Sequence, residues 1–221
     1  MARLRRLVPR GKTLIRIAKA FAALAALTSA SLGAGRPGDF DFYVLSLSWS
    51  PSYCETARRP DPEQCAAGDK GFVVHGLWPQ YERGYPDYCA RTARLPRSIV
   101  ASVADLMPAS LAQYQWEKHG TCAGLRPERY FDLVRRARER VAIPDAFAPL
   151  DDPLRTSPQA VEQAFLAANP GMSERGIAVT CSRSGTIEVR ICLTQRLDFR
   201  RCTEVDAGAC RERTIELPAM R

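Results

Sequence analysis

Apolar and polar residues alternate in two segments of the chain, and this alternation predicts half-buried strands. The segments are 42–49 and 186–193. A third run, 71–77, is almost entirely apolar and predicts a buried strand. The segment 176–181 precedes the second alternating run across Ser-Arg-Ser-Gly, which predicts an antiparallel pair. The side chains expected to face the core from the alternating runs are Tyr43, Leu45, Leu47, Trp49, Ile187, Val189, Ile191 and Leu193.

A period of three to four residues predicts helices over 99–107, 111–119 and 127–140. Another helix begins at Ser157-Pro158, an N-cap followed by proline at the first helical position, and ends at 169–171. The Pro- and Gly-containing stretches 50–70 and 78–96 are expected to be loops. Strands and helices do not alternate regularly, so the expected fold is α+β, with one domain over 35–221.

Charge is distributed unevenly along the 221 residues. The net charge is +8, but residues 1–34 hold seven basic side chains and no acidic one, so 35–221 carries only +1. Bulk charge therefore gives no support for nucleic-acid binding by 35–221. In 1–34 a basic stretch, a short apolar stretch and small residues follow one another, which predicts an export signal cleaved after Ala30 or Ala34. A basic amphipathic helix and a start codon assigned too far upstream are the alternatives. No apolar run is long enough for a membrane span.

Cysteine usage is consistent with export. All eight cysteines follow residue 34, and an even number in an exported chain predicts disulfides in a periplasmic or extracellular protein. Zinc binding requires closely spaced Cys or His pairs, and no two cysteines are nearer than Cys202 and Cys210. A metal site is therefore not expected.

Only two histidines occur in the chain, and both have distinctive neighbours. His75 lies inside an apolar strand, where a histidine is more often structural than catalytic. Gly76 follows it and leaves room for a ligand to approach, and Trp78 offers a planar surface for stacking. His119 shares a helix face with Gln115, four residues earlier, and Lys118 lies at the edge of that face. A solvated polar helix face is the alternative for this segment.

Two imidazoles and one cation suit the transfer of a phosphodiester to an internal hydroxyl. One imidazole can act as the base and the other as the acid, because histidine titrates near pH ~6.5. A neighbouring cation can stabilise the charge that develops on the phosphorus oxygens.

The segments 72–79, Phe-Val-Val-His-Gly-Leu-Trp-Pro, and 116–122, Trp-Glu-Lys-His-Gly-Thr-Cys, resemble the two active-site signatures of the ribonuclease T2 family. They occur in the family's order, and the resemblance covers residues 39–210. It implies an α+β fold in which an antiparallel sheet holds the first histidine and a helix holds the second, packed with several helices and stapled by disulfides. The implied activity is endoribonucleolytic cleavage of single-stranded RNA, with little base preference, through a 2′,3′-cyclic phosphate to 3′-phosphate ends.

The resemblance also implies roles for individual residues. His119 would take the 2′-hydroxyl proton, His75 would protonate the leaving 5′-oxygen, and Lys118 would stabilise the phosphorane. No cofactor, metal ion or obligate protein partner is implied, and the chain is expected to be a monomer. The residues expected to contact the substrate are Trp78, Tyr81 or Tyr85, and Trp116.

The position four residues before the second histidine departs from the family, which usually has Glu where this chain has Gln115. Glutamine can hydrogen-bond a phosphoryl oxygen but cannot transfer a proton as a carboxylate does. Tyr114 likewise stands where the family commonly has His. A weakly active relative that retains the RNA-binding groove is therefore one alternative function. An unrelated two-histidine phosphoesterase and a disulfide-stapled binding domain are the others.

The eight cysteines allow many connectivities, and the resemblance implies one of them. The bridge at the centre would tie the loop after the first signature to the end of the second. The implied pairs are Cys54–Cys65, Cys89–Cys122, Cys181–Cys210 and Cys192–Cys202.

Overall fold

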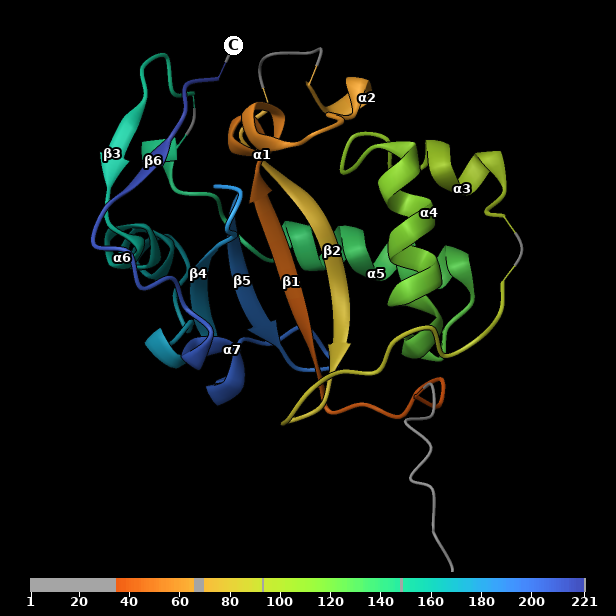
Figure 1. Ribbon diagram of the computed structural model, residues 1–221. Coiled ribbons are helices and arrows are strands. Elements are labelled where there is room, and N and C mark those ends of the chain that lie inside the picture. The colour runs from red at the N-terminus through yellow and green to blue at the C-terminus, as the bar shows by residue number, and fades with distance from the viewer. Residues whose placement is uncertain (1–34, 66–69, 93, 148, 221) are drawn as a thin grey trace, which may run out of the picture. The chain divides into compact units, whose positions relative to one another are not determined.

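A four-stranded antiparallel sheet forms the centre of the fold, with strand order β2-β1-β5-β4 (Figure 1). The computed structural model describes residues 35–65, 70–92, 94–147 and 149–220, and the predicted export segment 1–34 lies outside the described residues. All four predicted strands are present and the expected pair is antiparallel. Their bounds are β1 Phe42–Trp49, β2 Phe72–Gln80, β4 Ile177–Cys181 and β5 Ile187–Leu193.

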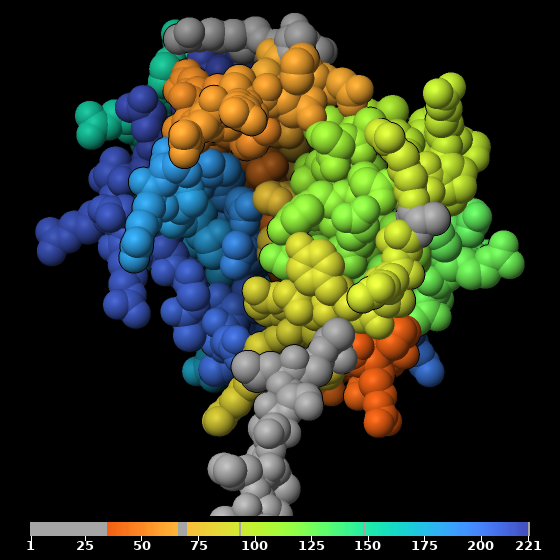
Figure 2. Space-filling view, turned by 45° about the vertical axis from the view of Figure 1, so that its right-hand side comes forward, coloured from red at the N-terminus to blue at the C-terminus, as the bar shows by residue number. Residues whose placement is uncertain are grey.

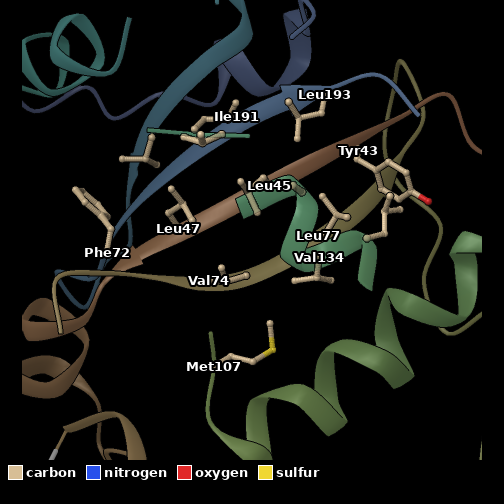
Figure 3. Packing of buried hydrophobic residues seen from close by; sticks show 14 of the residues in the cluster. Tyr43, Leu45, Leu47, Phe72, Val74, Leu77, Met107, Val134, Ile191 and Leu193 are labelled. Carbon is tan, nitrogen blue, oxygen red and sulfur yellow. The ribbon is translucent and has the colours of Figure 1, made fainter. Parts of the chain in front are cut away.

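One face of this sheet is covered by apolar side chains and forms the main core. Leu45 and Leu47 of β1 are fully buried, as the alternation predicts, and Ile191 of β5 lies beside them. Figure 3 shows Val74 and Leu77 of β2 on the same side as Val134 of a covering helix. That helix, α5, passes behind β1 and β2 in Figure 1. The opposite face of the central strands does not contribute to this main core.

The longer helices agree with the sequence period, and α6 begins as predicted because the Ser157 hydroxyl accepts a hydrogen bond from the Ala160 amide. The helix expected over 99–107 is shorter than predicted. It ends at Ala101, and the turns that follow keep Val103 and Met107 buried. The bounds are α3 Arg97–Ala101, α4 Ala109–Lys118, α5 Pro127–Glu139 and α6 Pro158–Ala168.

Several short elements differ from the prediction. The expected loop 50–70 contains two helices, because Pro51 stands in the first turn of one and Asp61 accepts the Glu63 amide at the start of the other. A two-stranded sheet and three 3₁₀ helices are also present, and they are too short to leave a periodic pattern. The bounds are α1 Ser50–Thr56, α2 Pro62–Cys65, α7 Thr203–Ala207, β3 Leu154–Thr156, β6 Ile215–Leu217, η1 Gly120–Ala123, η2 Asp145–Phe147 and η3 Glu174–Gly176.

Four disulfides are formed, and their pairing is the one that the family resemblance implies. The bridge at the centre joins the loop after β2 to η1, directly after His119. Backbone contact supports the same junction, since the Tyr88 amide donates to the Lys118 carbonyl over 2.8 Å. The pairs are Cys54–Cys65, Cys89–Cys122, Cys181–Cys210 and Cys192–Cys202.

Candidate active site

A β-bulge in β2 brings the first signature into the site. Ser46 of β1 pairs with Gly76 and Leu47 pairs with Val74, so His75 is the extra residue on the bulged strand. Val74 and Leu77 therefore both face the core although they are three residues apart. His75 and Trp78, also three apart, share the opposite face. In a regular strand the two-residue period would place them on opposite faces.

His75 is held from the side by a residue pair that the sequence analysis missed. Its Nδ1 lies 2.8 Å from Glu188 Oε1 of β5, and Arg190 Nη2 lies 2.8 Å from the other carboxylate oxygen. Burial raises the pKa of Glu188, but its hydrogen bond and charge interaction with His75, together with Arg190, outweigh burial and lower the pKa to about 2. The polar positions 188 and 190, alternating with buried Ile and Val, were the available signal.

Trp78 is the centre of contacts within the site. Its ring stacks on His119, with centroids 5.2 Å apart, and meets His75 edge-on at 5.6 Å. Its indole nitrogen donates to Gln115 Oε1 over 2.7 Å, and the Arg190 guanidinium lies 5.2 Å from the ring. Trp78 therefore links both histidines to residues of β5 and α4.

The space beside Gly76 is occupied by the protein itself, which corrects the expectation that it admits a ligand. A methyl group added at Gly76 would overlap the Gln115 oxygen and the Trp78 indole nitrogen. The glycine is required because the hydrogen bond between Trp78 and Gln115 passes directly over it.

His119 is the residue at which α4 ends and η1 begins. It shares the buried face of the helix with Gln115, as the spacing predicts; the two are 5% and 1% exposed. Burial lowers the pKa of His119 to about 3, with further contributions from the charges of Lys118 and His75. The imidazole is therefore neutral at physiological pH, and within the described residues its Nδ1 has no hydrogen-bond partner. Gln115 Nε2 is likewise buried and unpartnered there.

Lys118 lies among tyrosines at the surface. Its Nζ is 5.8 Å from the ring centroids of both Tyr85 and Tyr114. Partial burial lowers the pKa of Lys118, but interactions with Tyr114, Tyr85 and Tyr88 outweigh this and raise it, so the ammonium stays charged. Tyr85 is 51% exposed, with its ring 6.1 Å from that of His119. It therefore presents an open aromatic surface beside the site.

Two of the predicted substrate contacts lie elsewhere. Trp116 is 6% exposed and packs in the core against Tyr130 and Gly120, so the structure corrects its assignment to a base-binding surface. The physical reason is that Trp116 lies about 100° around α4 from Gln115, where its ring packs against Tyr130 of α5 instead of facing the cleft. Tyr81 is partly buried against the same core, and of the two tyrosines considered only Tyr85 contacts a site residue.

The site opens into a hollow between α4 and the β4–β5 side of the sheet. Figure 2 shows it between the green and light-blue parts of the chain, with orange and gold atoms of β1 and β2 at its floor. A cavity of about 260 Å³ lies beside His75. Its lining includes Ser48, Gln64, Leu111, Tyr114 and Thr186. A larger cavity of about 1140 Å³ lies over α3 and the start of α4 and contains neither histidine.

In the described part of the chain, no cluster of three or more His, Cys, Asp or Glu side chains is arranged to hold a metal ion. No described helix is both long and apolar enough to cross a membrane.

The fold and site together define an α+β protein with two histidines on opposite walls of a cleft. The family model described as "Ribonuclease T2 family" matches residues 40–202. The chain therefore belongs to the ribonuclease T2 family.

Individual relatives agree with that membership. A protein named "Ribonuclease" from Aeromonas hydrophila is 43% identical over 114 residues, which is 51% of this chain and 52% of that protein. A "Probable ribonuclease" from Haemophilus influenzae is 34% identical over 130 residues, covering 52% of this chain and 48% of that protein. The matched region thus spans about half the length of these relatives. The crystal structure of RNase NT in complex with 5′-AMP has a TM-score of 0.62 and 24% identity, over 82% of this chain and 99% of that chain, and supports the fold.

Proposed function

We propose that this protein is an endoribonuclease that cleaves single-stranded RNA without a metal ion. The reaction is a transesterification to a 2′,3′-cyclic phosphate, followed by hydrolysis to a 3′-phosphate. The observation that carries the proposal is the contrast between the two imidazoles. His119 is buried and neutral, as a base must be, whereas His75 is about one third exposed and its Nδ1 is paired with the Glu188 carboxylate at 2.8 Å.

In the first step, His119 accepts the proton of the 2′-hydroxyl, and that oxygen forms a bond to phosphorus. The bond from phosphorus to the 5′-oxygen breaks, and His75 gives its proton to that oxygen. In the second step, water attacks the cyclic phosphate with the two roles reversed. The bound phosphate brings negative charge next to His119, which opposes the effect of Lys118 and makes the imidazole a stronger base.

Lys118 and Gln115 act on the phosphate oxygens in this proposal. The Lys118 ammonium supplies positive charge, and the unpartnered Gln115 Nε2 supplies a neutral donor while its oxygen is held by Trp78. Glutamine in place of the family's glutamate thus keeps a hydrogen bond to the phosphate and gives up a proton-transfer group. Tyr85 provides a face on which a base can stack, and Trp78 supports both imidazoles from below. The RNase NT complex, which contains a bound adenosine monophosphate, is consistent with nucleotide binding in this fold.

We also propose that the protein works as a monomer after export to the periplasm or the medium. Four disulfides need an oxidising compartment to persist. N-terminal sequencing of the exported protein tests this, with a new terminus after residue 30 or 34 expected. A start at residue 1 in the exported protein would contradict cleavage.

The decisive experiment is RNA cleavage by the oxidised protein in excess EDTA, with the product ends identified. Fragments ending in 2′,3′-cyclic phosphate support the proposal and show that Gln115 is compatible with turnover. A folded, fully disulfide-bonded sample that binds RNA without cleaving it would instead favour the weakly active RNA-binding alternative, and Gln115→Glu would then be expected to restore cleavage.

A further inference from the structure

We propose that Glu188 is a positioning residue that holds His75 with its proton on Nδ1 and its Nε2 facing the cleft, and that Arg190 holds Glu188. The inference deepens the proposed function and rests on it, because it concerns how the acid of that reaction is prepared. Neither residue belongs to the two signature segments.

The two oxygens of the Glu188 carboxylate accept hydrogen bonds from two different residues. Glu188 Oε1 accepts from His75 Nδ1 at 2.8 Å, while Oε2 accepts from Arg190 Nη2 at 2.8 Å and from Nε at 3.2 Å. The Glu188 side chain is only 12% exposed. A carboxylate so buried is costly unless it is paired, and here each oxygen has a charged or chargeable donor. The orientation of Glu188 is therefore fixed before any substrate binds.

The sheet makes this contact possible across an intervening strand. His75 is on β2 and Glu188 is on β5, with β1 between them. The outward positions of β1 at that level are Ser46, which pairs with Gly76, and Ser48, which pairs with Glu188. Their side chains are small enough to let the imidazole and the carboxylate meet above β1. The serines therefore account for a contact that two larger residues would block.

The charged and titratable groups around His75 make the carboxylate important. From β5 it faces Glu188 and Arg190, and the end of α4 contributes the charged Lys118 and the neutral His119. Across the adjoining cavity lie Tyr114, Tyr53 and Asp61. Glu188 is the anion in direct contact with His75. Removal of its charge therefore weakens the protonated form that the leaving group needs.

The test uses Glu188→Gln, which keeps an oxygen acceptor for Nδ1 and removes the charge. We expect kcat/KM at pH 7 to fall by about 10- to 100-fold, by analogy with the loss seen when the hydrogen-bond partner of a metal-binding histidine is removed. The KM is expected to stay near the wild-type value because Glu188 is only 12% exposed and both of its oxygens are occupied by His75 and Arg190. The alkaline side of the pH–rate profile moves to lower pH. Glu162→Gln is the matched control, since that partly buried carboxylate accepts the Val179 amide and contacts neither histidine.

An NMR titration separates failure of this inference from failure of the proposed function. The chain has two histidines, so imidazole ¹⁵N spectra contain two ring systems, and His75→Ala assigns them. We expect the His75 ring to titrate at lower pH in Glu188→Gln than in the wild type, and wild-type ¹⁵N shifts to show the proton on Nδ1. An unchanged His75 titration overturns the inference, whether or not the protein cleaves RNA.

Arg190→Gln provides a second variant that leaves the carboxylate in place. Because Arg190 holds Glu188, its removal is expected to loosen the carboxylate and to move the His75 titration in the same direction as Glu188→Gln, by a smaller amount. The control Glu162→Gln should leave the His75 titration unchanged. An equal shift in Glu162→Gln would indicate a general disturbance of the protein and overturn the assignment.

Discussion

The two walls of the cleft hold the same side chain in opposite surroundings. On the sheet wall, His75 is about one third exposed and paired with a buried carboxylate. On the helix wall, His119 is buried beside a lysine, with its Nδ1 unpartnered in the described structure. The first environment gives the imidazole a carboxylate partner, and the second keeps the imidazole neutral. Acid and base are thus distinguished by what surrounds each ring.

The difference also follows from the type of element. Neighbouring strands bring outward side chains from separate parts of the chain into contact, so His75 gains a partner from β5, more than a hundred residues away. At the end of α4, His119 has Gln115 and Lys118 of its own segment beside it, and its contact from the sheet is the ring of Trp78 rather than a charged side chain.

The largest effect is expected when each imidazole is removed in turn. We expect His75→Ala and His119→Ala each to lower kcat on RNA by roughly 10²–10⁴-fold. A uridine 3′-phosphate ester with a nitrophenol leaving group distinguishes them, because nitrophenolate departs without a proton. His75→Ala should then recover most of its activity and His119→Ala should not. Equal recovery by both variants would contradict the assigned roles.

The pH dependence of the protein's stability tests the environment of His119 without any substrate. His119 has its pKa lowered from 6.5 to about 3 by folding, so between these values the unfolded chain binds more protons. Stability is therefore complete above about pH 6.5 and declines as the pH falls toward 3, by roughly 3–5 kcal/mol. Glu188 adds a loss only below its ordinary value, because its pKa is also lowered, to about 2.

Denaturant unfolding as a function of pH measures this decline. In His119→Gln the fall between pH 6.5 and 4.5 should disappear, while the part due to Glu188 at lower pH remains. A wild-type stability that is flat over this interval would show that the buried imidazole is not held neutral.

Lys118 sharpens the comparison, because it acts on both the phosphate and His119. We expect Lys118→Met to lower kcat by roughly 10²-fold through loss of charge stabilisation. It should also move the acid side of the pH–rate profile to higher pH, since one of the charges that lowers the pKa of His119 is gone. Lys70→Met is the control, as Lys70 donates to the exposed Glu63 carbonyl and, among the described residues, makes no hydrogen bond to either histidine. An equal change in kcat and in the pH–rate profile of both variants would show that Lys118 does not act in the site.

The smallest effect is expected at the open aromatic surface. Tyr85→Ala should raise KM by about tenfold with little change in kcat, as the loss of one base stack costs roughly 1–3 kcal/mol. Tyr88→Ala serves as the comparison because Tyr88 is equally exposed and its ring does not contact either histidine in the described structure. A KM that rises equally in both variants would argue against a specific stack on Tyr85.

Much of the fold was predictable because it rests on local periodicity. The four strands of the central sheet and the capped helix α6 follow from alternation and from Ser157-Pro158. The short strands β3 and β6 were not predictable, since three residues show no period and their pairing joins segments about sixty residues apart.

The site residues that could be predicted are those that lie within short segments of the sequence. His75, His119 and Gln115 all contact Trp78, and the charge of Lys118 acts on His119. Glu188 was missed because its role depends on strand order, which alternation alone does not specify. Trp116 was misassigned because a conspicuous aromatic in a signature segment says nothing about which side of the helix it faces.

The bulge at His75 changes which residues of β2 face the core. Up to Val74 the even-numbered residues face the core, and from Leu77 onward the odd-numbered ones do. The extra residue shifts the alternation by one position. Both the acid, His75, and the tryptophan, Trp78, therefore point away from the core. Deletion of His75 would leave Gly76 paired with β1 as before and Leu77 in the core, so it would remove the acid without reversing the faces of the strand. A graft of this signature onto another strand must carry its extra residue with it.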